Sequence, residues 1–152
     1  TAELIGTALL VAIVIGSGIM AETLTSDVGV SLLLNQVATV AGLGVLVVVL
    51  MPISGAHINP VVTLAVLLRR EIHVREAAGY LVAQLFGALA GVALAHVMFG
   101  RALLELSGNN RLTTGTFVGE IIATCGLIVI IVLLVHRGSE SLIPLAVPAW
   151  IG

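Results

Sequence analysis

The chain of 152 residues is 59% hydrophobic and only 9% charged, with a mean hydropathy of +1.24. A soluble domain carries about 25% charged residues, so this composition excludes a soluble protein and indicates a membrane protein. The net charge of −2 and the lack of a basic cluster in the sequence argue against a nucleic-acid partner. The single cysteine, Cys125, excludes a disulfide framework within one chain.

Four apolar stretches are long enough to cross a bilayer, since a spanning helix needs about 20 residues. They cover residues 2–21, 32–50, 77–99 and 117–135. Polar connections are predicted at residues 22–31, 101–116 and 136–141, and a fifth apolar segment begins at residue 142. The sequence therefore predicts an all-α protein that lies in the lipid bilayer.

The arginines of the connections are divided unequally between the two sides of this arrangement. One side has Arg69, Arg70, Arg75 and Arg137, and the other has Arg101 and Arg111. The positive-inside rule places the first group in the cytoplasm. We therefore expect a multi-pass protein of the plasma (inner) membrane with a cytoplasmic N-terminus.

A stretch at residues 54–68 joins the second and third spans and does not fit a straight membrane helix. Pro52, Gly55 and Pro60 all disfavour a continuous helix. Asn59 followed by Pro60 is typical of an N-cap and a first helical residue. A helix from Asn59 to the end of the stretch is about 15 Å long, roughly half a bilayer core. We expect a re-entrant half-helix with its amino end near the midplane; the alternative is a simple loop before a capped helix.

Non-helical backbone at membrane depth survives only where protein buries it or where it lines a water-filled cavity. Four carbonyl groups without helical partners are predicted to face such a cavity, those of Gly55, Ala56, His57 and Ile58. The amide of Asn59 adds donors beside the positive end of the half-helix dipole. A small neutral solute can exchange hydrogen bonds with water for these groups, while cations and protons meet a barrier.

Ten consecutive residues resemble the first pore loop of the aquaporin and aquaglyceroporin family, the major intrinsic proteins. They are Ser54, Gly55, Ala56, His57, Ile58, Asn59, Pro60, Val61, Val62 and Thr63. The family usually has Asn-Pro-Ala, and here Val61 stands in place of the alanine as a slightly larger wall residue. The resemblance implies an aquaporin-like helical bundle, a passive channel for water or small uncharged solutes, and a homotetramer. No cofactor is expected, and the dispersed histidines do not predict a metal site.

A faint internal repeat relates the first and fourth spans, because Glu3-Leu4-Ile5-Gly6-Thr7 matches Glu120-Ile121-Ile122-Ala123-Thr124. Three crossings separate the two, which is the pattern of an inverted repeat. We expect one incomplete channel domain over residues 1–152, with the first repeat at residues 1–99 and the start of the second at residues 117–152. The family's second Asn-Pro-Ala loop and its filter arginine are not in this sequence.

The resemblance implies that Glu3 and Glu120 accept hydrogen bonds from the pore loops and hold them in shape. The alternatives are a proton relay and carboxylates at the membrane interface. The resemblance also places Thr39 in the outer filter, where a small hydroxyl side chain favours glycerol-sized solutes or metalloids such as arsenite. The alternative for Thr39 is a hydrogen bond to its own helix.

Two features of the third span concern packing. Gln84 is expected to point inward to a partner, and Gly87 and Gly91 are expected to let another helix of the same chain approach closely. Two rival functions stay open: a secondary transporter with broken helices, and a membrane assembly subunit that transports nothing. No nucleophile, base and orienting group fall together, so the sequence does not support an enzyme.

Overall fold

The computed structural model of the chain describes residues 1–103 and 113–152, so most of the predicted loop at residues 101–116 lies outside it. Within those ranges all regular elements are helical, which confirms the all-α prediction. The elements in chain order are α1 (Ala2–Leu24), α2 (Val28–Ser54), α3 (Pro60–Leu68), α4 (Val74–Met98), α5 (Thr114–His136), the 3-10 turn η1 (Glu140–Leu142) and α6 (Ile143–Ile151). Four of these described helices, α1, α2, α4 and α5, are long and apolar enough to cross a membrane.

The long helices extend beyond the apolar stretches because polar residues cap them. α2 begins at Val28 rather than at residue 32, since the Asp27 carboxylate accepts a hydrogen bond from the Val30 N–H at 2.9 Å. α5 begins at Thr114 rather than at residue 117, since Thr113 and Thr116 form a capping box. The predicted polar connections are correspondingly shorter in the structure.

The helix before the re-entrant stretch ends at Gly55 and not at Pro52. The sequence predicts that Pro52 contributes to the break, but α2 continues through it to Ser54. A proline is tolerated inside a membrane helix when neighbouring groups satisfy the backbone that it frees. Gly55 adopts a left-handed φ of 80° and donates its N–H to the Met51 carbonyl, which ends the helix.

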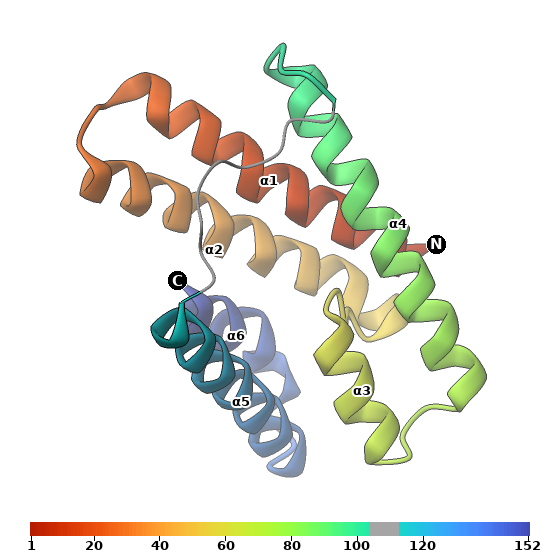
Figure 1. Cartoon of the computed structure of the whole chain (residues 1–152). Coiled ribbons are helices and arrows are strands. Elements are labelled where there is room, and N and C mark those ends of the chain that lie inside the picture. Colours follow the sequence, from red (N-terminus) through yellow and green to blue (C-terminus); the bar gives the residue numbers. More distant parts are fainter. Residues whose placement is uncertain (104–112) are drawn as a thin grey trace.

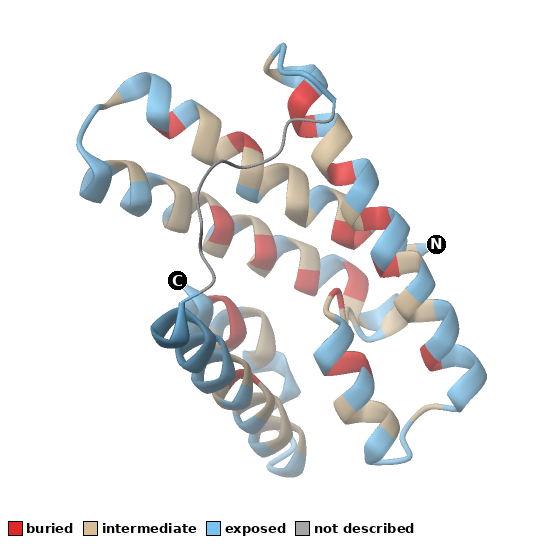
Figure 2. Cartoon of the chain, in the orientation of Figure 1, coloured by how far each residue is buried: buried red, intermediate tan, exposed pale blue. Residues whose placement is uncertain are grey.

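α1 packs against α2 on one side and α4 on the other (Figure 1), and each of the three helices carries buried residues (Figure 2). Two glycines of α4 lie directly against backbone carbonyl groups of α1. A Cβ added to Gly87 would lie 2.5 Å from the Leu4 carbonyl oxygen, and one added to Gly91 would collide with the Ala8 carbonyl oxygen. The two glycines therefore serve packing within the chain, as the sequence predicts.

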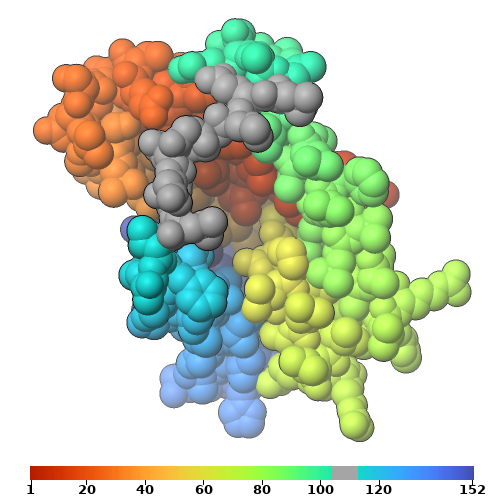
Figure 3. Space-filling view, in the orientation of Figure 1, coloured from red at the N-terminus to blue at the C-terminus, as the bar shows by residue number. Residues whose placement is uncertain are grey.

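The half-helix α3 lies between α4 and α5 (Figure 3). Its bounds agree with the predicted helix from Asn59 to residue 68, and its nine residues fall well short of a bilayer span. Its inner face joins a core built by α2, α3, α5 and α6. The buried members of that core are Leu43, Val47, Val62, Leu127 and Val147.

We predict that Gly91→Ala lowers the free energy of unfolding by about 1–3 kcal/mol, because the new methyl group forces α1 and α4 apart. Gly79→Ala on the same helix is the control, since a Cβ there meets nothing within 4 Å. The control should be neutral or slightly stabilising. Thermal unfolding in detergent measures both variants. Equal stability of the two would show that the close approach of the helices is not needed.

Candidate functional site

The segment between α2 and α3 has left-handed backbone angles at three of its residues. Ala56 and Ile58 have left-handed φ angles of 49° and 46°, next to Gly55 at 80°. Such angles cost about 1–2 kcal/mol for a residue with a side chain, and they are rare for a β-branched residue. The conformation persists because surrounding groups fix it, which is a property of functional segments.

The carboxylate of Glu3 on α1 is the main group that fixes this segment. Its Oε1 accepts from the Ser54 hydroxyl at 2.6 Å and the His57 N–H at 3.0 Å. Its Oε2 accepts from the Ile58 N–H at 2.7 Å and the Gln84 side-chain amide at 2.8 Å. Glu3 is 2% exposed, and its recorded partners among the described residues are all neutral donors. Four donors occupy the acceptor sites of one carboxylate and compensate for its burial.

A second set of hydrogen bonds links the segment to α3 and α4 through Thr63, which is fully buried. Its Oγ1 accepts from the Gln84 amide at 3.0 Å and lies 3.1 Å from Nδ1 of His57. The His57 ring also meets the Tyr80 ring edge-on, with centroids 5.1 Å apart, and the Tyr80 hydroxyl donates to the Ser54 carbonyl at 3.1 Å. The imidazole is thus held on two sides.

Asn59 caps α3 in the way that its sequence position predicts. Its Oδ1 accepts from the Val61 N–H at 2.8 Å, and Pro60, which has no N–H, is the first helical residue. Because the cap uses Oδ1, the two N–H groups of Nδ2 remain as donors. They lie at the N-terminus of α3, where the helix dipole is positive.

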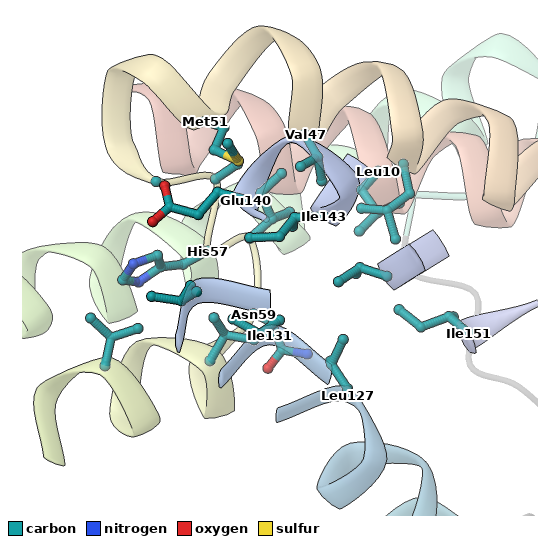
Figure 4. Close-up of a pocket in the computed structure, with 18 of the residues that line it drawn as sticks. Leu10, Val47, Met51, His57, Asn59, Leu127, Ile131, Glu140, Ile143 and Ile151 are labelled. Carbon is teal, nitrogen blue, oxygen red and sulfur yellow. The ribbon is translucent and has the colours of Figure 1, made fainter. Parts of the chain in front are cut away.

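Residues 55–59 line a cavity of about 520 Å³ between α2, α3, α5 and α6, a volume typical of small-molecule sites. The sequence predicts five of its wall residues, Gly55, Ala56, His57, Ile58 and Asn59. In the view of Figure 4, Asn59 lies between His57 and Glu140 on one side and Leu127 and Ile151 on the other. The rest of the wall is apolar except for two carboxylates, those of Glu71 and Glu140.

Three N–H groups of this wall are already hydrogen-bonded within the described part of the chain, whereas the carbonyl groups of residues 55–58 are not. Glu3 takes the N–H groups of His57 and Ile58, and the cap of α2 takes that of Gly55. Among the described residues, no recorded hydrogen bond is accepted by the carbonyl groups of residues 55–58. The cavity therefore offers backbone acceptors, together with the Asn59 donor, against aliphatic surroundings.

Other predicted site residues lie away from this wall. Thr39 is buried, but it does not line the cavity, and its hydroxyl has no hydrogen-bond partner in the described part of the chain. Val61 is 43% exposed and also does not line it. Pro60 follows Asn59 as the first residue of α3 and does not line the cavity. Glu120 on α5 is exposed and has no recorded hydrogen bond within residues 1–103 and 113–152, so its role as a loop support stays a prediction.

The sequence predicts no role in this network for Ser54, Thr63 and Tyr80. For two of them the sequence nevertheless contains a signal. Thr63 follows Asn59 by one helical turn, and Tyr80 precedes Gln84 by one turn, so each shares a helix face with a residue already singled out. Gln84 itself points inward to partners, as the sequence predicts.

The long apolar helices, the half-helix α3 and the lined cavity define a multi-pass membrane protein with a solute-sized cavity. The model of the major intrinsic protein family matches residues 1–152, and the chain belongs to that family. It is 47% identical over 127 residues to "Aquaglyceroporin AqpS" of Rhizobium meliloti (strain 1021), a match that covers 84% of this chain and 54% of that protein.

Two human proteins match a shorter region. Aquaporin-5 is 42% identical over 90 residues, and Aquaporin-2 is 44% identical over 87 residues. Each match covers 56% of this chain, 33% of Aquaporin-5 and 32% of Aquaporin-2. The chain thus spans about half the length, or less, of the curated relatives that it matches.

We predict that Glu3→Gln destabilises the fold strongly, since Gln has one acceptor oxygen and adds donors that face the loop N–H groups. Each buried donor left unpaired costs about 1–3 kcal/mol. Glu22→Gln, at the exposed end of the same helix, should change stability by less than about 0.5 kcal/mol. Thermal unfolding of the two variants checks this, and similar values would contradict the anchoring role of Glu3.

Proposed function

We propose that the protein containing this chain is a passive membrane channel for water and small uncharged solutes. The observation that carries the proposal is the cavity wall at residues 55–59, where backbone acceptors and the Asn59 donor meet in a mostly apolar cavity. A solute that leaves water exchanges its hydrogen bonds for these groups, and apart from the Glu71 and Glu140 carboxylates the other wall residues are apolar and offer it none.

Charge selection follows from the same groups. Asn59 lies at the positive end of α3, so a cation approaching it meets an unfavourable field. An ion of either sign also loses hydration against the aliphatic part of the wall, which costs far more than for a neutral solute, and the Glu71 and Glu140 carboxylates disfavour anions in addition. The path therefore favours neutral solutes.

The class of solute is proposed from two supports. The relative AqpS is named an aquaglyceroporin, and Thr39 stands at the position that the family resemblance assigns to the outer filter, with a side chain smaller than an aromatic ring. We propose glycerol-sized solutes or neutral metalloids such as arsenite, in addition to water. The enzyme alternative has no support in the site.

The arrangement in the cell is proposed on the same basis. The plasma membrane, a cytoplasmic N-terminus and a homotetramer follow from the arginine distribution and the family. An inverted repeat, with residues 1–99 as its first half and residues 117–152 opening its second, accounts for the sequence match around Glu3 in α1 and Glu120 in α5.

Flux in vesicles reconstituted with the full-length protein tests the channel. Swelling in glycerol or water should be independent of proton and sodium gradients. Asn59→Asp, which replaces the Nδ2 donors with a carboxylate, should lower glycerol permeability by about tenfold. Dependence on an ion gradient would establish a secondary transporter, and unchanged flux in Asn59→Asp would favour an assembly subunit.

Thr39→Phe tests the filter assignment separately. A phenyl ring narrows the proposed filter, so glycerol permeability should fall several-fold more than water permeability. Stopped-flow light scattering with each solute gives the two values. If glycerol permeation is unchanged in a correctly folded variant, Thr39 does not belong to the filter.

A further inference from the structure

The side chain of Gln84 on α4 forms hydrogen bonds that reach both parts of the segment at residues 54–68, the non-helical part and the half-helix α3. Its Nε2 donates to Oε2 of Glu3 at 2.8 Å and to Oγ1 of Thr63 at 3.0 Å. Glu3 holds the non-helical half, since the same Oε2 accepts the Ile58 N–H at 2.7 Å. Thr63 belongs to the half-helix α3. One amide group therefore joins the loop to the helix that follows it.

The neighbouring carboxylate fixes the orientation of this amide. Reversing it would set Oε1 against Oε2 of Glu3, and two acceptors at hydrogen-bond distance repel each other. Both hydrogens of Nε2 are thus used, one for each partner. The Oε1 of Gln84 has no hydrogen-bond partner in the described part of the chain, although the residue is only 2% exposed. The side chain is held by its two donated bonds.

Thr63 connects Gln84 to Asn59, the residue that caps α3. Its hydroxyl lies 3.2 Å from the Asn59 carbonyl, to which it donates, and its backbone N–H donates to the same carbonyl at 3.1 Å. A shift of Thr63 therefore moves the backbone of Asn59. Gln84 itself does not line the cavity, so any effect that it has on a solute must pass through these neighbours.

We propose that Gln84 is a positioning residue that sets the place of Asn59 in the cavity wall and, through it, the selectivity between glycerol and water. The selectivity part rests on the proposed channel function, whereas the placement part does not. Removing the two donors should loosen the non-helical half and the half-helix together, because a single group holds both.

The test is a double-mutant cycle of Gln84→Met and Thr63→Val in the full-length protein. Gln84→Met keeps the length of the side chain and removes both donors, and Thr63→Val removes the hydroxyl. The ratio of glycerol to water permeability in vesicles is the first readout. Each single change should alter this ratio by about threefold or more, and the double change should have less than the combined effect of the two, because both single changes remove the Gln84–Thr63 hydrogen bond.

Hydrogen–deuterium exchange of the His57 and Ile58 amides is the second readout, and it requires no flux. Exchange at these amides should accelerate in Gln84→Met, while the amides in the middle of α2 keep their protection. Gln36→Met is the control: Gln36 lies on α2, is half-buried and has no recorded hydrogen bond in the described part of the chain. The control should leave the ratio and the exchange unchanged.

Unchanged exchange and an unchanged ratio in folded Gln84→Met would overturn the proposal, as would additive effects in the double variant. If the unmodified protein carries neither water nor glycerol, the channel proposal fails, and the exchange data alone decide the placement. If Gln84→Met does not fold, Gln84→Asn takes its place, since it keeps the amide but shortens it by one methylene. The same two shifts are then expected.

Discussion

The structure depends on the hydrogen bonds between the Glu3 carboxylate and the N–H groups of His57 and Ile58. A chain that leaves the helix inside a membrane exposes peptide groups that lipid cannot satisfy. Glu3 satisfies the donors, and the Ser54 and Gln84 donors complete its own shell. The interaction is mutual, because a buried carboxylate without donors would be equally unfavourable. In a buried position, neither the loop N–H groups nor the acid would be satisfied without the other.

This anchoring also sets the chemistry of the cavity. Since the N–H groups of His57 and Ile58 bond to Glu3, the carbonyl groups of residues 55–58 remain for a solute. Asn59 shows the opposite division, with its oxygen used by the cap and its nitrogen left as a donor. Acceptors and one donor thus lie along one wall of a cavity whose other lining residues are apolar except for Glu71 and Glu140. The interactions that stabilise the loop are those that give the proposed channel its preference for neutral hydrogen-bonding solutes.

Local signals in the sequence predict the half-helix well, because the Asn59 cap and Pro60 act on their own turn. The long helices were predicted too short at their ends, since an apolar count misses caps such as Asp27 and Thr113. The partners of Glu3 lie 51 to 81 residues away in the chain, and only the family resemblance pointed to the loop among them. The sequence predicts no role for Thr63 or Tyr80, because their roles depend on how α3 and α4 pack. The lining of the cavity by α5 and α6 is likewise a product of tertiary packing.

The central claim is that Glu3 holds the tip of a half-helix deep in the bilayer. A depth measurement with spin labels tests it most directly, using single cysteines at Val61 and Leu68 in a Cys125→Ala background. Both positions are exposed, and they mark the two ends of α3. The account predicts that Val61 lies about 10 Å deeper than Leu68, from the rise of 1.5 Å per residue. Equal depths, or a Val61 label at the headgroups, would contradict it.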